Sequence, residues 1–254
     1  MSIWTADDNS AINFEIHGNE HGPTLLLLPG LLGTANQWSR FVAPLAADFR
    51  VVLVDLRGHG RSENRAATLE PEQMVRDILG LLEHLGVDAT HVAGYSLGGY
   101  LGLMLHLNEP RRVSSLLMHA TKFYWTAESI ANLRQQLDPD QLAEKVPSYA
   151  NQLAADHGAN RWRTVVRQAA DLVVRLGETG LTERAARRAQ LPVLVSVGDR
   201  DELVTLAEAL RLSRVLAEGQ LLVLPGVRHP LASAPAVPLL PTMQYFHQGA
   251  GRHS

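Results

Sequence analysis

Six short apolar runs that end in turn residues constrain the fold of this chain more than any other feature. Within each run the apolar character is continuous rather than alternating, which is typical of strands buried on both faces of a parallel sheet. Helical patterns separate the runs, and the clearest covers residues 71–85, with Pro71 in its first turn and Gly86 at its C-terminal cap. Strands that alternate with helices predict an α/β protein with a doubly wound, mostly parallel sheet. The six runs cover residues 25–28, 51–54, 91–93, 115–118, 193–197 and 221–224.

Two segments depart from the strand–helix alternation. The chain is expected to open with a β-hairpin, because apolar segments at 3–5 and 12–17 flank a cluster of turn residues. Residues 121–190 contain no convincing strand, although a crossover needs only about a dozen residues. Their pattern predicts helices at 128–137, 141–153, 161–176 and 182–188. We therefore expect a core formed by residues 1–120 and 191–254, with residues 121–190 inserted between two strands as a helical lid.

The composition is that of an ordinary globular protein and argues against several classes of function. Apolar residues make up 46% of the chain and charged residues 19%. The net charge of −3 gives no reason to expect nucleic acid or an anionic membrane as a partner, and the absence of cysteine excludes disulfides and thiolate metal sites. No apolar signal segment follows the early acidic residues, and the uncharged stretches 92–105 and 230–246 are interrupted by glycine or proline. The sequence predicts a cytoplasmic protein with a small-molecule substrate.

A serine at residue 96 lies at the point where a strand passes sharply into a helix. The segment Gly94-Tyr95-Ser96-Leu97-Gly98 follows the apolar run 91–93 and precedes the apolar run 100–107. Such a turn forces strained backbone geometry on the serine and brings strand and helix close together, so small residues are needed two positions to either side. This pattern is typical of a nucleophile elbow, which holds a serine hydroxyl out at the end of a sheet.

A serine hydroxyl needs a general base, usually an imidazole that a carboxylate orients. For a nucleophile on such an elbow the expected chain order is serine, acid, histidine. Of the eleven histidines, His229 fits best, because it follows the last strand in the loop expected to deliver the base. His119 emerges at the same edge of the sheet but is better placed to line the pocket, and His157 falls in the lid, where we expect it to be solvated.

The orienting acid is expected in the loop after the run 193–197, which holds Asp199, Asp201 and Glu202. Asp199 lies at the strand end, where a role as a cap or as an ion-pair partner of Arg200 is the simpler interpretation. Asp201 lies further round the turn, from where a carboxylate can point across the sheet edge toward His229. We favour Asp201 over Asp199 because the acid must reach Nδ1 of the imidazole.

Two backbone N–H groups should form an oxyanion hole. One is that of Leu97, directly after the nucleophile. The other is expected in the glycine-containing loop that follows the run 25–28, where Leu31 is the candidate donor. By contrast, the segment 55–62 crowds Asp, Arg, His and Ser together, but we interpret it as a glycine-rich turn held by local hydrogen bonds.

Together these motifs resemble those of the α/β-hydrolase superfamily, in the family's order along the chain. The matching segments are 28–33 with Trp38, 55–62, 94–99, 198–201 and 225–229. The family's Gly-x-x-Asp turn supports Asp201 as the acid, and Pro29 replaces a histidine that many members carry before the oxyanion glycine. The resemblance implies an α/β-hydrolase fold with a Ser96–Asp201–His229 triad and no cofactor or metal. Candidate pocket residues are Trp38, Tyr95, His119, Phe123, Tyr124, Trp125 and Trp162.

The expected function is hydrolysis of a small or medium carboxylic ester, lactone or thioester through an acyl-enzyme on Ser96. Two alternatives stay open. The elbow is also similar to that of the menaquinone-pathway lyase, and a lyase or C–C bond hydrolase would use the same triad. That lyase carries an arginine where this chain has Tyr100, so an anion clamp would have to come from Arg134, Arg161 or Arg163 of the lid. The third possibility is a ligand-binding homologue with a vestigial site.

Overall fold

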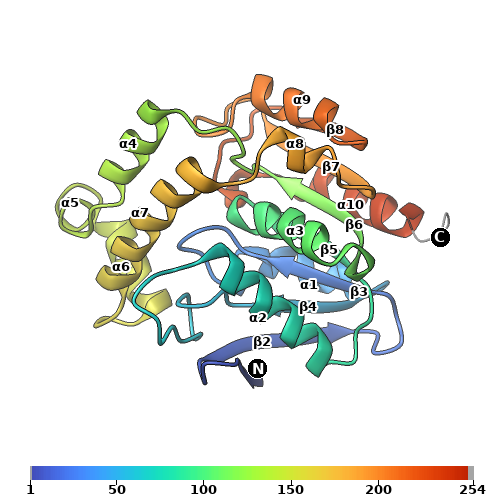
Figure 1. Ribbon diagram of the computed structural model, residues 1–254, viewed down its shortest axis with the longest axis horizontal. Coiled ribbons are helices and arrows are strands. Elements are labelled where there is room, and N and C mark those ends of the chain that lie inside the picture. The colour runs from blue at the N-terminus through green and yellow to red at the C-terminus, as the bar shows by residue number, and fades with distance from the viewer. Residues whose placement is uncertain (1, 251–254) are drawn as a thin grey trace.

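A computed structural model describes residues 2–250 and contains one eight-stranded sheet (Figure 1). The strand order is β1-β2-β4-β3-β5-β6-β7-β8, with β1 and β2 antiparallel to their neighbours and the remaining pairs parallel. All six predicted strands and the opening hairpin are confirmed. The strands are β1 (Ser2–Thr5), β2 (Ala11–Gly18), β3 (Thr24–Leu28), β4 (Arg50–Val54), β5 (Thr90–Tyr95), β6 (Val113–His119), β7 (Pro192–Gly198) and β8 (Glu218–Leu224).

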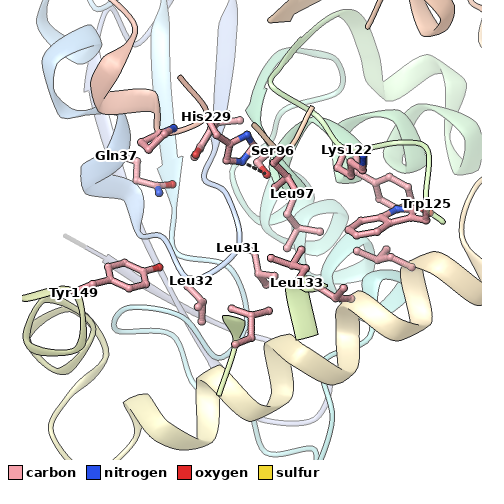
Figure 2. A pocket seen from close by; sticks show the side chains of 17 residues that line it. Leu31, Leu32, Gln37, Ser96, Leu97, Lys122, Trp125, Leu133, Tyr149 and His229 are labelled. Carbon is pink, nitrogen blue, oxygen red and sulfur yellow. Dashed lines mark hydrogen bonds between the residues drawn. The ribbon is translucent and has the colours of Figure 1, made fainter. Parts of the chain in front are cut away.

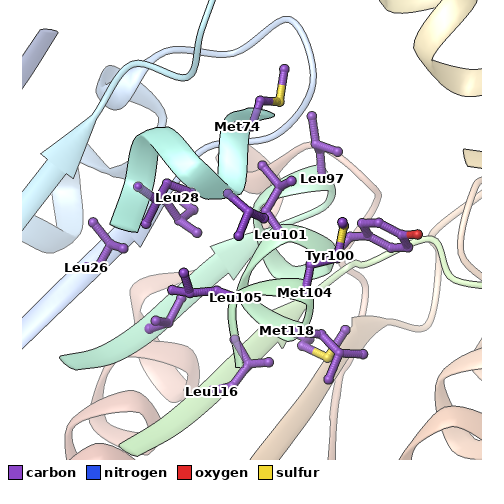
Figure 3. Packing of buried hydrophobic residues seen from close by; sticks show 14 of the residues in the cluster. Leu26, Leu28, Met74, Leu97, Tyr100, Leu101, Met104, Leu105, Leu116 and Met118 are labelled. Carbon is purple, nitrogen blue, oxygen red and sulfur yellow. The ribbon is translucent and has the colours of Figure 1, made fainter. Parts of the chain in front are cut away.

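Helices cover both faces of the sheet because its central strands are apolar on both sides. In β3, Leu26 and Leu28 belong to one buried cluster, whereas Leu25 and Leu27 belong to another. The first cluster includes residues of α2 (Pro71–His84), α3 (Leu97–Asn108) and α9 (Leu206–Val215), and the second includes residues of α1 (Ser39–Leu45) and α10 (Ala236–Ala250). Figure 3 shows Leu101 and Leu105 of α3 packed among leucines of the neighbouring strands. This close packing fixes the start of α3, and therefore residue 96, relative to the sheet.

The segment between β6 and β7 is helical, as the sequence predicts. It contains α4 (Ala127–Gln136), α5 (Pro139–Lys145), α6 (Pro147–His157), α7 (Trp162–Thr179) and α8 (Glu183–Ala186). Helices α4–α7 gather beyond the end of the sheet toward which the parallel strands run (Figure 1). The single helix predicted at 141–153 is wrong, because the chain breaks into α5 and α6 at Pro147. Proline lacks the N–H that a continuous helix needs, and it keeps Val146 before it out of the helical region, at φ −136° and ψ 59°.

The crowded turn at 55–62 has a structural role, as expected, but its ion pairs extend beyond the turn. The guanidinium of Arg57 is 1% exposed and donates to both carboxylate oxygens of Asp77, at 2.6 and 2.7 Å, and to Asp8. Asp55 accepts hydrogen bonds from the backbone N–H groups of Ala35 and Arg61. The turn therefore ties the opening hairpin, α2 and the loop after β3 together. In the described part of the chain, no helix is both long enough and apolar enough to cross a membrane.

Several histidines are buried and uncharged in the folded protein. Burial lowers the pKa of His59 and of His119 to about 4 in each case, from an ordinary value of 6.5. His247 on α10 is also fully buried, and burial lowers its pKa as well. Burial also lowers the pKa values of His91, His106 and His157.

We expect these buried histidines to make the protein acid-labile. Below pH 6.5 these histidines become protonated in the unfolded chain but stay neutral in the folded protein. The stability that is present above pH 6.5 is therefore lost as the pH falls toward 4. For His59 and for His119 the loss between pH 7 and pH 5 is about 2 kcal/mol each. Urea unfolding over this pH range should therefore show a steep fall in the free energy of unfolding, and a flat profile would contradict the assignment. The variant His119→Gln should reduce this fall by about 2 kcal/mol, because only the contribution of His119 is removed.

Candidate active site

The turn between β5 and α3 has the geometry of a nucleophile elbow. Ser96 lies at its apex with φ 51° and ψ −113°, a strained region for a residue with a side chain. The backbone N–H of Ser96 donates to the carbonyl of His119 at 2.8 Å, which ties the elbow to the end of β6. A Cβ atom on Gly94 would lie 2.2 Å from the carbonyl carbon of Gly98, and one on Gly98 would lie 2.3 Å from the carbonyl oxygen of Leu28. Both glycines are therefore required by close backbone contacts.

The variant Gly98→Ala is expected to destabilise the protein, because its Cβ would collide with the backbone of β3. The expected loss is about 3 kcal/mol, the upper end of the range for overpacking, since backbone atoms cannot rotate away. Gly249→Ala is the matched control: nothing lies within 4 Å of the added Cβ, so its stability should stay within about 0.5 kcal/mol of the parent. Thermal and urea unfolding measure both. Equal stability of the two variants would contradict the assigned packing of the elbow.

The structure brings Ser96, His229 and Asp201 into one hydrogen-bonded chain. Oγ of Ser96 lies 3.3 Å from Nε2 of His229, drawn as a dashed line in Figure 2. Nδ1 of His229 lies 2.9 and 3.1 Å from the two carboxylate oxygens of Asp201. The Asp201 side chain has no solvent exposure, and Oδ1 also accepts the backbone N–H groups of Leu203 and Val204. This arrangement fixes the imidazole with its proton on Nδ1 and leaves Nε2 free to accept a proton from the serine.

Asp199, the alternative acid, is occupied elsewhere. Its Oδ1 accepts the backbone N–H of Gly226 at 2.6 Å, so it caps the loop that carries the histidine rather than touching the imidazole. His119, the alternative base, is fully buried, with Nδ1 at 3.1 Å from Oγ of Ser196. Both contacts support the preference that the sequence gives to Asp201 and His229.

The two backbone N–H groups expected to form an oxyanion hole are those of Leu31 and Leu97. Leu97 is the first residue of α3, and Leu31 lies in the loop after β3; among residues 2–250 neither N–H has a hydrogen-bond partner. Both side chains line the same cavity as Ser96. An N–H at a helix N-terminus also carries part of the positive end of the helix dipole, which favours negative charge.

The loop that carries Leu31 is held from two directions. From the short 3-10 helix Ala35–Trp38 that follows the loop, Oε1 of Gln37 accepts the backbone N–H of Gly30 at 2.9 Å. From α6, the ring of His157 accepts the N–H of Gly60 at Nδ1, at 2.8 Å, and donates from Nε2 to the carbonyl of Leu32, at 3.1 Å. The expectation that His157 is solvated is therefore wrong: it is 1% exposed and connects α6 to this loop. Sequence alone could not find this role, because the contact joins residues 125 positions apart.

A cavity of about 330 Å³ lies in front of Ser96 (Figure 2). Of the seven predicted pocket residues, only Tyr95 and Trp125 line it among the residues that the structure describes. Trp38 and Trp162 are buried in apolar clusters, and the Trp38 indole donates to the carbonyl of Leu28. His119, Phe123 and Tyr124 also lie outside the lining. The residues that the sequence did not single out are Leu32, Gln37, Tyr100, Lys122, Leu133, Leu137, Tyr149, Val173, Leu176, Leu203 and Pro230.

The three lid arginines proposed as an anion clamp do not line this cavity. Arg161 is hydrogen-bonded to the backbone carbonyls of Gly60 and Ser62, and Arg163 pairs with Asp140. Arg134 lines a separate hollow on the surface of α4 and α7. The one lysine in the lining, Lys122, is paired with Glu208 at 2.6 Å.

Comparisons with known proteins agree with the observed fold. The family model described as alpha/beta hydrolase fold matches residues 23–165. A RutD protein of Variovorax paradoxus, provisionally named a carbamate hydrolase, is 38% identical over 109 residues, which cover 42% of this chain and only 41% of the relative. The protein named 3-oxoadipate enol-lactonase 2 of Acinetobacter baylyi is 25% identical over 80% of each chain. Among solved structures, a thermophilic esterase of Thermogutta terrifontis superposes with a TM-score of 0.83 at 21% identity, covering 98% of this chain and 99% of the esterase.

Proposed function

This chain belongs to the α/β-hydrolase fold family, and from that premise we propose that it is a serine hydrolase that cleaves ester-like substrates through an acyl-enzyme on Ser96. The observation that carries the proposal is the hydrogen-bonded chain from Ser96 through His229 to Asp201, with two unpartnered N–H groups beside the serine. Binding alone would not require these three side chains in this order and geometry.

The mechanism follows from the positions of these groups. Oγ of Ser96 attacks the substrate carbonyl while Nε2 of His229 takes its proton, and Asp201 stabilises the imidazolium. The N–H groups of Leu31 and Leu97 bind the oxyanion, and each such donor contributes about 2.7–4 kcal/mol to transition-state stabilisation. His229 then gives its proton to the leaving group, and it activates a water molecule that hydrolyses the acyl-enzyme. No step needs a cofactor or a metal ion.

The relatives support an ester-like substrate class. Their names refer to carbamate and enol-lactone hydrolysis, and both of these reactions cleave a carbonyl from a heteroatom leaving group. The lyase alternative is less well supported, because the arginines that it would need as an anion clamp are engaged elsewhere or lie outside the cavity. We further propose that helices α4–α8 form the lid of this cavity, since Leu133 of α4, Tyr149 of α6 and Leu176 of α7 line it.

A series of p-nitrophenyl esters from acetate to dodecanoate tests the proposal. We expect turnover with a maximum at short to medium acyl chains, because the cavity lies at the small end of the range for ligand pockets. Rapid mixing should also reveal a burst of about one equivalent of p-nitrophenol per active site, the kinetic sign of an acyl-enzyme. Absence of turnover across the whole series would contradict ester hydrolysis.

A further inference from the structure

The cavity has two chemically different sides, with Ser96 between them. Figure 2 shows Lys122, Trp125 and Leu133 on one side of Ser96, and Gln37 and Tyr149 on the other. The first group is called the acyl side below, and the second the leaving-group side. From this division we infer that the substrate is an uncharged ester whose acyl chain is apolar and whose leaving group carries a hydrogen-bond-accepting oxygen, bound by Gln37. The inference rests on the proposed function and narrows its substrate class.

The amide of Gln37 is fixed in one orientation. Its Oε1 accepts the N–H of Gly30, and because that N–H can only donate, the oxygen must face it. The space for this amide exists because residue 33 is glycine: a Cβ there would lie 2.1 Å from Oε1 and 2.4 Å from Nε2. Nε2 therefore carries two N–H groups, for which residues 2–250 supply no acceptor. Since Gln37 lines the cavity, a substrate oxygen is the partner that these donors can take.

The direction of the leaving group follows from the position of the base. His229 must deliver its proton to the leaving-group oxygen, so the leaving group has to lie on the His229 side of Ser96. Figure 2 places Gln37 on that side, with His229 between Gln37 and Ser96. Tyr149, on the same side, is 40% exposed, so the leaving group can depart toward solvent past this residue.

The acyl side favours an uncharged, mostly apolar chain. Leu133 and the ring carbons of Trp125 contribute apolar surface, and the buried indole N–H of Trp125 is a neutral donor with no hydrogen-bond partner among residues 2–250. The ammonium of Lys122 is already paired with the carboxylate of Glu208 at 2.6 Å. These two side chains are only 10% and 23% exposed, so a substrate carboxylate would lie close to Glu208 and would have to compete with it for Lys122.

Two esters of equal size test the role of Gln37. Methoxyethyl butanoate and butyl butanoate differ in one leaving-group atom, an ether oxygen in place of a methylene. Their kcat/KM values are measured by pH-stat titration and divided by their rates of hydroxide-catalysed hydrolysis, which removes the difference in intrinsic reactivity. We expect a ratio of about ten in favour of the ether, the upper end of the range for one hydrogen bond between neutral groups.

The variant Gln37→Glu separates substrate binding from support of the loop. A glutamate retains an acceptor for the N–H of Gly30 but has no donor for the ether, so the normalised ratio should fall to one or below. The ratio of the two normalised kcat/KM values is the readout, because a weakened oxyanion loop or a new charge near His229 would lower the rate for both esters alike. Gln135→Glu, at an exposed position of α4, makes the same chemical change away from the cavity and should keep the parent ratio.

The outcomes distinguish this inference from the proposed function. If the parent enzyme hydrolyses both esters with a normalised ratio near one, or if Gln37→Glu keeps the parent ratio, the role of Gln37 is overturned while ester hydrolysis stands. If neither ester is hydrolysed and a fluorophosphonate leaves Ser96 unlabelled, the proposed function itself fails.

A charged acyl chain tests the acyl side. The monoester of succinate with methoxyethanol should have a kcat/KM at least about tenfold below that of methoxyethyl butanoate. An equal or higher value would overturn the uncharged acyl chain.

Discussion

Replacing Ser96 with alanine is expected to lower kcat for ester hydrolysis about a million-fold, because the members of such a triad act as a unit. The residual rate would come from the two free N–H groups and from substrate positioning. Steady-state kinetics with the best p-nitrophenyl ester measure the effect, with protein repurified on unused columns to exclude contamination by the parent. Ser148→Ala, at an exposed position of α6, is the matched control and should keep the parent rate. A Ser96→Ala variant within tenfold of the parent would contradict nucleophilic catalysis by this residue.

The second large loss of kcat is expected when the triad acid, Asp201, is replaced with asparagine. Asp201→Asn preserves the size of the side chain and an oxygen for the N–H groups of Leu203 and Val204. It removes the charge that faces Nδ1 of His229 and allows the imidazole to adopt the wrong tautomer. We expect a loss of about ten-thousand-fold in kcat, with little change in unfolding temperature.

Asp199→Asn provides the comparison within the same loop. Its Oδ1 accepts the N–H of Gly226, and the oxygen of an asparagine can do the same, so kcat should stay within about threefold of the parent. The two variants differ in position by only two residues, which makes the pair a sharp test. A larger loss at Asp199 than at Asp201 would reverse the assignment of the acid.

The strands were predictable because their signal is local. Each buried strand of a parallel sheet is a continuous apolar run, and five of the six runs correspond to β3–β7. The sixth run corresponds to β8, an edge strand in which only Leu224 is buried. The break between α5 and α6 is hidden in the sequence because the apolar pattern continues across it, although Pro147 starts a new helix there. The burial of His247 could not be predicted from sequence, because a buried histidine that is hydrogen-bonded to Ser115 cannot be told from a solvated one by its neighbours along the chain.

The candidate triad was predictable because chain order and strand ends restrict where its members can lie. The cavity lining was not, because it depends on how α4, α6 and α7 pack over the sheet. Trp38 and Trp162 were predicted to line the pocket, yet both pack into apolar clusters, where large aromatic side chains bury the most surface. Gln37 and Lys122 belong to no sequence motif that would have predicted their place in the lining. They line the cavity through contacts with Gly30 and Glu208 that no local pattern encodes.

Labelling with a fluorophosphonate, followed by peptide mass spectrometry, tests the nucleophile most directly. The reagent bonds covalently only to a serine activated by a base and supported by an oxyanion hole. We predict modification of Ser96 alone, with about one label per chain, and no labelling in the Ser96→Ala variant or after acid unfolding. A folded protein that leaves Ser96 unmodified, or that carries the label on a different serine, would contradict the assignment of Ser96 as the catalytic nucleophile.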